Sequence, residues 1–391
     1  MDVTLSAEAR DIQRTARAFV ERELLPLEPV LLKREIDGGK AALLPDELAH
    51  LQKVARDSGL WGIDLAPEYG GAGLDTFLIT LINIELGRTL VRFKFGGSPS
   101  PLPDLNVLRE GPRAQFLADV VEGGQISVFA LTEPRGGSDA GNPATVAVRD
   151  GNEWVINGEK TFISRADIAD YAFVAARTTD DTGETGVTLF MVERAHGFTS
   201  SPVPVMQGAF ATGSLSFQDV RVPDENVVGE VNKGLAVAMA KLHDARVSLS
   251  TATNIGASDR LLEMMIAYAG QRTTFGAPLS SRQSIQEMVV ESEIEVRSAK
   301  LLALHAARKL SRGEEARHDA AVAKLYAARA CNRIVDRALQ VHGGMGMAME
   351  MPIQWWYRAL RVERIWEGSD QMMENAIQRT LVGKRISVGQ L

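Results

Sequence analysis

The sequence predicts an α+β protein with three consecutive parts: an N-terminal helical domain over residues 1–125, a β-barrel-like middle domain over residues 126–232, and a C-terminal four-helix bundle over residues 233–391. Apolar residues recur at helical spacing through the first third of the chain. Near Ile126 β-branched and aromatic residues begin to alternate with polar ones, and turn signals become closely spaced. Long helical patterns return from about Gly234, which favours an antiparallel bundle.

Proline and glycine set the limits of the first predicted helices. Helical spacing runs from Ser6 to about Ile36. A second helix is expected from Pro45 to Gly59, because proline suits a helix start and glycine a helix end. The segment Asp75–Arg88 returns to a helical period.

In the middle part, Asn157-Gly158 is typical of a two-residue hairpin turn. We therefore expect a hairpin with the strands Trp154–Ile156 and Lys160–Ile163. Further strands are predicted at Tyr171–Arg177, Gly186–Val192 and Ser214–Val220.

The last third contains four helical patterns. One begins at Asp370 and runs to about Leu381, with Ser369 as its N-cap and Gly383 as its stop. The other three are Leu235–Ala269, Ser284–Leu310 and Glu315–Val341.

Composition excludes several classes of protein. The 391 residues include 43 Lys and Arg against 50 Asp and Glu, and the resulting charge of −7 argues against general affinity for nucleic acid or an anionic membrane. No run is apolar and long enough to span a bilayer. The single cysteine, Cys331, excludes a disulfide framework and a cysteine-rich metal site, and no metal is expected. The first residues carry neither a basic leader nor an apolar core, so a cytoplasmic location is expected.

One carboxylate stands out. Glu367 follows Trp366 and precedes Gly368, directly before the predicted helix start at Ser369. Backbone N–H groups, an aromatic ring and apolar surface can together adjust the pKa of such a carboxyl group. Taken alone, a glutamate near a helix start more often only complements the helix dipole.

A glycine-rich stretch, Leu131–Asp139, opens the middle part. Its glycines allow backbone N–H groups to approach a ligand, and Thr132 and Ser138 offer hydroxyls. A tight turn at a strand end is the alternative interpretation.

Two further motifs, Arg272–Gly276 and Gln340–Gly344, follow in the last third. Together with Leu131–Asp139 and Trp366–Ser369, in this order and spacing, they resemble the acyl-CoA dehydrogenase family and its fold. The resemblance covers nearly the whole chain and is weakest over Arg92–Gln115.

This resemblance implies FAD as cofactor and the oxidation of an acyl-CoA to its trans-2-enoyl-CoA. Glu367 would remove the α-proton while hydride passes from the β-carbon to flavin N5. The backbone N–H of Glu367 and a ribityl hydroxyl of the flavin would hold the thioester oxygen. Gly368 would let the acyl chain pass.

The family motifs also assign binding residues. Thr132 would bond the pyrimidine end of the flavin, Ser164 its N5, and Arg272 a diphosphate across a subunit boundary. The complete predicted flavin set is Phe129, Leu131, Thr132, Gly137, Ser138, Phe162, Ile163, Ser164, Arg272, Thr274, Phe275, Gln283, Gln340, Gly343, Gly344, Ser369 and Gln371. The predicted substrate set is Ser138, His243, Arg246 and Gly368.

Some positions depart from the family pattern. Certain members carry the base just before an arginine of the first bundle helix, where this chain has Ala245 before Arg246. His243 replaces the common aspartate, and Phe162 stands where tryptophan is frequent. Arg135 either favours a charged or polar acyl group or faces solvent.

Because the flavin would be shared between subunits, a homotetramer, or at least a dimer, is expected. The expected partners are an acyl-CoA and an electron-transfer flavoprotein, with neither nucleic acid nor membrane. Alternatives are an acyl-CoA oxidase, a nitroalkane-oxidase-like enzyme, or a flavin-retaining relative that binds DNA. The sequence does not identify the acyl group.

Overall fold

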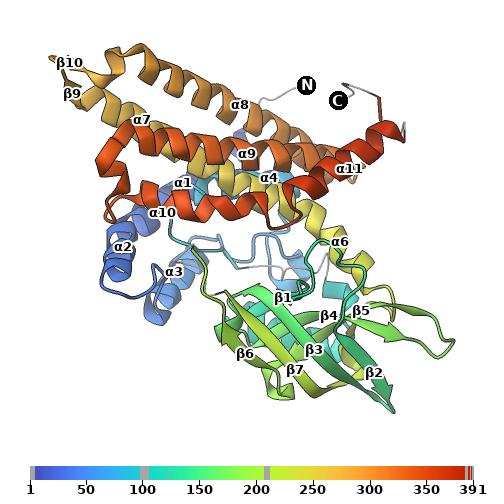
Figure 1. Ribbon diagram of the computed structural model, residues 1–391. Helices are drawn as coiled ribbons and strands as arrows, with labels where there is room; N and C mark the ends of the chain where they lie inside the picture. Colours follow the sequence, from blue (N-terminus) through green and yellow to red (C-terminus); the bar gives the residue numbers. More distant parts are fainter. Residues whose placement is uncertain are drawn as a thin grey trace.

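The computed structural model describes residues 5–96, 105–122, 124–206, 212–383, 386–387 and 389. Figure 1 shows helices of the first part at one side, a β-sheet below them, and a bundle of long helices across the top. The predicted fold class is confirmed. The predicted limits of the three domains stay predictions.

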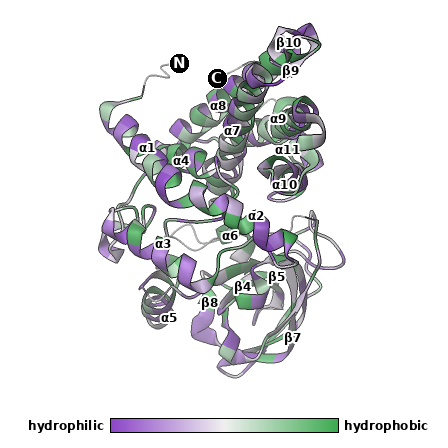
Figure 2. Cartoon of the chain, turned by 90° about the vertical axis from the view of Figure 1, so that its left-hand side faces the viewer, coloured by the Kyte–Doolittle hydropathy of each residue, from purple (hydrophilic) through white to green (hydrophobic). Residues whose placement is uncertain are grey.

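The N-terminal part is helical, as predicted. Ser6 and Asp75 are N-caps, because their side chains accept hydrogen bonds from the backbone N–H groups of Ala9 and Leu78. Helices α1 and α3 carry both hydrophilic and hydrophobic residues (Figure 2). The helices are α1 (Ala7–Phe19), α2 (Glu28–Ile36), α3 (Pro45–Asp57), α4 (Thr76–Leu86) and α5 (Glu110–Phe116), with a π-helical turn at Val20–Leu24 after α1.

The middle part is a mixed sheet with the strand order β6-β7-β3-β2-β4-β5-β8, in which β1 pairs with β4. Strand β4 runs parallel to β1 and β2, and the other pairs are antiparallel. The strands are β1 (Ser127–Ala130), β2 (Val146–Asp150), β3 (Glu153–Ser164), β4 (Tyr171–Thr179), β5 (Thr185–Glu193), β6 (Thr199–Pro202), β7 (Thr212–Pro223) and β8 (Val227–Val228).

The predicted hairpin at Asn157-Gly158 is wrong. These residues lie inside strand β3, where the pairing register with β7 shifts between Ile156 and Gly158. A Cβ on Gly158 would lie 2.5 Å from Thr145 Oγ1, so the glycine serves close strand packing. The real hairpin joins β2 to β3 through Gly151, which has a φ of 63°.

The last part contains the four predicted helices. The pattern Leu235–Ala269 forms one helical rod, in which the turn Arg246–Thr251 is π-helical and the parts on either side are α-helical. Ser369 is the N-cap of the last helix, and Gly383 lies at its end. The elements are α6 (Gly234–Ala245), α7 (Ala252–Gln271), α8 (Gln283–Ser311), α9 (Arg317–His342), α10 (Pro352–Ala359) and α11 (Asp370–Val382), with a short β9–β10 arm at Thr273–Thr274 and Ala277–Pro278. The sequence did not predict α10.

Helix α4 packs closely on α7. A Cβ on Gly256 would lie 1.9 Å from the carbonyl oxygen of Ile84, so only glycine permits this approach. Helix α10 is tied to α2 by Arg358, which donates to both carboxylate oxygens of Glu35 at 2.8 and 2.9 Å. Over the residues described, no helix is both long and apolar enough to cross a membrane.

Candidate active site

Glu367 lies in a strained turn between a 3-10 segment, Leu360–Arg364, and the start of α11. Its φ is 51° and that of Gly368 is 94°, so both residues adopt left-handed backbone conformations. Two cations hold this turn: Arg246 Nε donates to the Glu367 carbonyl at 2.7 Å, and Lys324 Nζ donates to the Gly368 carbonyl at 2.6 Å. Strain of this kind persists only where surrounding contacts hold it, and it is common at functional sites.

The Glu367 carboxyl group lies in a desolvated environment. Its Oε2 is buried and has no hydrogen-bond partner among the described residues. Burial, and next the neighbouring Glu363, raise its pKa to about 7, while Arg246, Lys94 and Lys324 oppose the rise. A carboxylate with a pKa near neutrality can both accept and release a proton.

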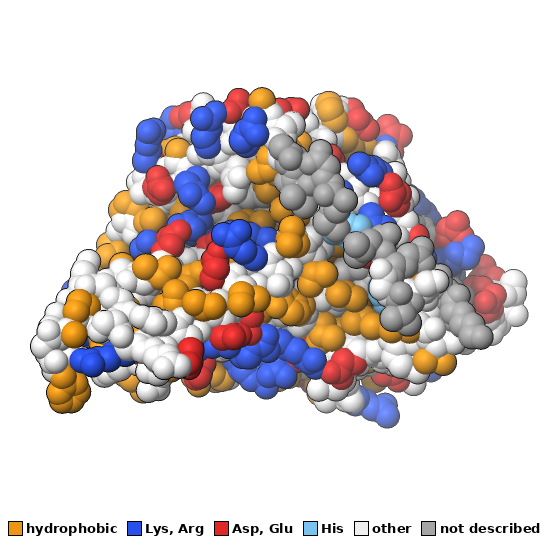
Figure 3. Space-filling model, turned by 90° about the horizontal axis from the view of Figure 1, so that it is seen from above, with side chains coloured by type: hydrophobic (Ala, Val, Ile, Leu, Met, Phe, Trp, Pro, Cys, Tyr) orange, Lys and Arg blue, Asp and Glu red, His pale blue; other side chains and the backbone are white. Residues whose placement is uncertain are grey.

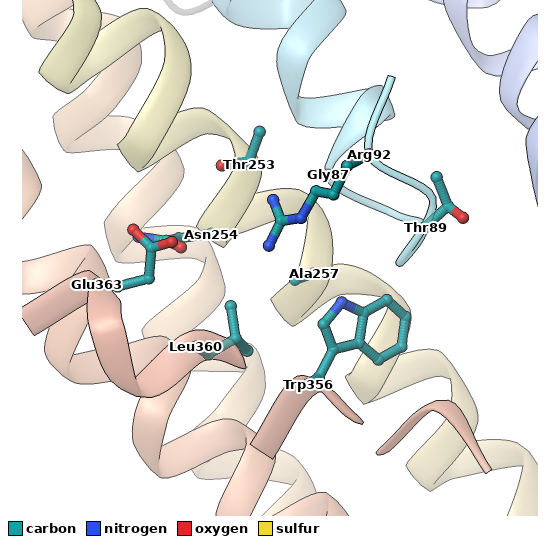
Figure 4. Close-up of a pocket in the computed structure, with 9 residues that line it drawn as sticks. All are labelled: Gly87, Thr89, Arg92, Thr253, Asn254, Ala257, Trp356, Leu360 and Glu363. Carbon is teal, nitrogen blue, oxygen red and sulfur yellow. The ribbon is translucent and has the colours of Figure 1, made fainter. Parts of the chain in front are cut away.

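Glu363 is a second buried carboxylate behind the first, with only 1% of its surface exposed. Its Oε2 accepts hydrogen bonds from Trp366 Nε1 at 2.7 Å, and from Ser250 Oγ and Asn254 Nδ2 at 3.1 Å each. Figure 4 shows Arg92 reaching toward Asn254 and Glu363 across a small pocket. Burial raises the pKa of Glu363, and the charge of Arg92 opposes that effect.

The alternative base position is occupied by a buried Ala245, which has no titratable group. Near it, His243 Nδ1 lies 3.1 Å from Arg246 Nη1. Burial, and next the charge of Arg246, lower the pKa of His243 to about 4. With so low a pKa, the His243 imidazole is a weaker proton acceptor than the Glu367 carboxylate, whose pKa is about 7.

The glycine-rich loop is fixed by a buried ion pair. Lys160 Nζ donates to Glu133 Oε1 at 2.7 Å and to the Leu131 carbonyl at 3.2 Å. The backbone N–H groups of Ala144 and Thr145 donate to the same Glu133 carboxylate. The loop beyond Glu133, which includes Arg135, Gly137 and Ser138, is exposed.

Phe162 lies beside this loop. Thr161 N–H donates to the Thr132 carbonyl at 2.9 Å, so β3 and the loop are direct neighbours. The φ of Phe162 is 55° and 61% of its surface is exposed, whereas Ile163 is buried in the sheet. Ser164 ends the strand and is partly exposed. An exposed aromatic ring here can cover a planar ligand.

The β9–β10 arm projects from the opposite end of the bundle (Figure 1). Phe275 at its tip has a φ of 49° and is 99% exposed. His342 stacks on Tyr268 at 4.3 Å, which places the end of α9 near the base of the arm. The predicted flavin residues at this end, all at least partly exposed, are Arg272, Thr274, Phe275, Gln283, Gln340, Gly343 and Gly344.

The structure therefore brings the predicted residues together in three groups. Thr132 and Phe162 belong to a group in the β part, the arm residues form a second group at the ends of α7 and α9, and His243, Arg246 and Gly368 form a third around Glu367. Sequence reasoning missed the residues that hold the first group and Glu367 in place. They are Glu133 and Lys160 at the loop, and Lys324 and Glu363 at the Glu367 turn; Glu133 lies inside a recognised motif. Arg92 and Lys94, whose charges affect the pKa values of Glu363 and Glu367, were missed as well.

Comparison with known proteins identifies the family. Models of the acyl-CoA dehydrogenase N-terminal, middle and C-terminal domains match residues 6–102, 128–220 and 232–382. The (R)-benzylsuccinyl-CoA dehydrogenase of Thauera aromatica is 35% identical, over 98% of this chain and 97% of that protein. The caffeyl-CoA reductase-Etf complex subunit CarC of Acetobacterium woodii is 33% identical, over 97% of this chain and 99% of that protein.

A solved structure supports the same family. A glutaryl-CoA dehydrogenase from Mycobacterium smegmatis, in complex with FADH2, has a TM-score of 0.84 at 28% identity, over 98% of this chain and 96% of that chain. The chain belongs to the acyl-CoA dehydrogenase family, whose members are FAD-dependent. Its activity is that of an oxidoreductase on the CH–CH bond of an acyl-CoA.

Proposed function

We propose that Glu367 is the base that removes the α-proton of the acyl-CoA, and that FAD is the resident cofactor. The buried Oε2 of Glu367, which has no hydrogen-bond partner among the described residues, is the observation that carries this proposal. Burial raises the pKa of this group to about 7, so the carboxylate is a stronger base than an exposed glutamate.

The residues around the first group fit a flavin. The exposed ring of Phe162 offers a face for a planar ring system, and the adjoining loop offers the Thr132 and Ser138 hydroxyls. Leu131 and Gly137 lie in the same loop, Phe129 is partly buried on β1, which leads into it, and Ser164 adds a hydroxyl at the end of β3. When bound there, FAD would supply the hydride acceptor. Ser369 and Gln371, at the start of α11, complete the proposed set.

For the substrate, the proposed contacts are Ser138, His243, Arg246 and Gly368. The Glu367 backbone N–H would donate to the thioester oxygen, which stabilises negative charge as the α-proton leaves. Because Gly368 has no Cβ, the side chains of Met373 and Arg246 can pack directly against the turn beside the base. Arg246 keeps its positive charge next to this turn and fixes the Glu367 carbonyl.

We propose a homotetramer in which the arm of one subunit completes the flavin site of another. Phe275 would not remain 99% exposed if a neighbour covered it. Val290, Ile294 and Leu301 of α8 are about half exposed and lie on one face of that helix. Figure 3 shows a band of hydrophobic side chains across the side of the molecule that carries α8.

We propose an electron-transfer flavoprotein as the electron partner, because CarC is named as a subunit of a reductase-Etf complex. A reducing compartment, the cytoplasm, suits the free, buried Cys331. Since one relative is named a dehydrogenase and another a reductase, the reaction should be assayed in both directions.

The test compares the unaltered protein with Glu367→Gln. Both are expected to hold FAD and to bind acyl-CoA, but the variant should reduce its flavin about 10²–10⁴-fold more slowly. The measurement is anaerobic bleaching of the flavin after mixing with a panel of acyl-CoA thioesters. Glu8→Gln, an exposed glutamate in the first turn of α1, is the control. Bleaching of Glu367→Gln within a few-fold of the control would show that Glu367 is only structural.

A further inference from the structure

The pocket in Figure 4 is small, and its walls come from parts of the chain that are far apart in the sequence. They are the segment after α4, helices α7 and α10, and the 3-10 segment that precedes the Glu367 turn. The space in which the centre of a water molecule can lie is about 10 Å³. One buried water needs about this much space, so a larger ligand would not fit.

One polar atom at this pocket needs a hydrogen-bond donor. Asn254 lines the pocket and is 1% exposed, and its Oδ1 has no partner within the described part of the chain. The amide group cannot turn over, because its Nδ2 donates to Glu363 Oε2 at 3.1 Å and a carboxylate only accepts. A buried acceptor without a donor is unfavourable, so the pocket favours a ligand that donates to Oδ1.

The other polar groups of the pocket define this ligand further. The described hydrogen bonds to Glu363 all end on Oε2, so Oε1 can still accept. The hydroxyls of Thr89 and Thr253 already donate to other oxygens. Arg92, on the other side of the pocket, can only donate.

The ligand must therefore donate to two oxygens and accept from a guanidinium group. A water molecule can do both. An anion would lie against the acceptor oxygens of Asn254 and Glu363, and a metal cation would lie beside the charge of Arg92.

We propose that this pocket binds one water molecule, which donates to Asn254 Oδ1 and Glu363 and accepts a hydrogen bond from Arg92. Glu363 in turn accepts from the indole of Trp366, the residue before Glu367. The water thus connects the turn of the proposed base to the segment after α4. This site goes beyond the proposed function, because it concerns the support of the turn and not the removal of the proton.

The first experiment is a high-resolution crystal structure of the unaltered, FAD-loaded protein. One peak of water density should lie about 2.5–3.2 Å from Asn254 Oδ1, from a Glu363 oxygen and from an Arg92 nitrogen. The proposal is overturned by a pocket without density, by a metal ion at this place, or by a direct hydrogen bond from Arg92 to Asn254 Oδ1 in place of the water.

A second experiment separates the water from the other contacts of Glu363. Ser250 and Asn254 each donate to Glu363 Oε2 at 3.1 Å, but of these two only Asn254 lines the pocket. Crystals of Ser250→Ala should keep the water, and those of Asn254→Leu should lose it. A water that persists in Asn254→Leu crystals would contradict the site.

The same two variants give a measurement in solution. The midpoint of urea unfolding should fall further for Asn254→Leu than for Ser250→Ala, because the hydrogen bonds of the water are lost as well. An equal or smaller fall would count against the proposal, because removal of an acceptor that has no donor costs little. If Asn254→Leu does not fold, the crystal structure of the unaltered protein decides. Flavin reduction is not measured, so failure of the proposed function would leave these outcomes unchanged.

Discussion

Trp366 Nε1 donates a 2.7 Å hydrogen bond to the carboxylate of Glu363. The donor is the residue directly before the proposed base, and the acceptor is anchored by Ser250 and Asn254 of the neighbouring helical rod. Glu363 therefore connects the turn that carries Glu367 to a fixed part of the bundle. It also brings a second negative charge close to the base, which affects the pKa of Glu367.

The first prediction concerns pH. Since Glu367 must be ionised to accept a proton, kcat/KM for flavin reduction should rise as the pH passes about 7. Burial is the larger cause of this raised pKa and Glu363 the next, so Glu363→Gln should shift the midpoint to lower pH without restoring the ordinary glutamate value. The measurement is the pH profile with one acyl-CoA. Glu374→Gln, an exposed site on α11, is the control. Equal midpoints in all three proteins would contradict the role of Glu363.

A second prediction concerns the buried pair that fixes the glycine-rich loop. Lys160→Met leaves the Glu133 carboxylate buried without its cation, which should lower the free energy of unfolding by about 3–5 kcal/mol. Glu133→Gln combined with Lys160→Met should recover much of this loss, because no charge is then buried unpaired. Urea denaturation measures both. A single variant as stable as the double variant would contradict this account.

The same ion pair should make the free energy of unfolding depend on pH in the acid range. Burial opposes the ionisation of Glu133, but hydrogen bonds from Lys160 and from the backbone of Ala144 and Thr145 hold its pKa at about 2. The pKa of Glu133 is lower in the folded protein than in the unfolded chain, where a glutamate has a pKa of about 4.3. Ionisation of Glu133 therefore stabilises the folded protein fully at pH values above about 4.3. This contribution should disappear as the pH falls from about 4 toward 2. Unfolding of the unaltered protein and of the double variant at several pH values checks it, and parallel pH dependences would refute it.

The sequence predicted the secondary-structure elements better than the tertiary contacts between them. Helix limits at Ser6, Pro45 and Ser369 follow from local capping, which a sequence records directly. The hairpin prediction failed because Asn157-Gly158 has the composition of a turn, and only the pairing of β3 with β7 decides its conformation. Composition does not record which strands pair.

The same limit applies to the site. Trp366–Ser369 identified the proposed base, but Arg92 and Glu363 are 271 positions apart in the numbering and come together only through the packing of α4 on the bundle. The positive φ values of Phe162, Phe275 and Glu367 could likewise not be predicted from the sequence, since none of these residues is of a type that favours this conformation. Tertiary hydrogen bonds hold the Glu367 turn, whereas Phe275 has its positive φ in the tight turn that joins β9 to β10.

A further prediction concerns assembly. Phe275→Ser should weaken association of the subunits, and Arg272→Ala should weaken FAD retention while the fold is kept, because both residues lie on the exposed arm. Sedimentation and flavin occupancy after gel filtration measure the two effects. Val148→Ser is the control, since Val148 is a similarly exposed apolar residue on β2. A monomeric protein with full flavin occupancy would exclude a shared site.

The last prediction concerns the glycine after the proposed base. At Gly368 the φ of 94° disfavours any side chain, and an added Cβ would lie 2.6 Å from Met373 Cε and 3.3 Å from Arg246 Nη2. Gly368→Ala should therefore lower the free energy of unfolding by about 1–3 kcal/mol. It should also slow flavin reduction, because relief of the contact would move the Glu367 carboxylate.

Gly270→Ala is the matched control. Gly270 lies in α7, and an added Cβ would meet nothing within 4 Å, so alanine should stabilise the helix by about 0.5–1 kcal/mol. Thermal unfolding and anaerobic flavin bleaching separate the two variants. Displacement of the base predicts that Gly368→Ala bleaches more slowly than Gly270→Ala even at temperatures where both are fully folded. Equal rates there would mean that the Glu367 turn tolerates a side chain and that its strained conformation is not needed for proton removal.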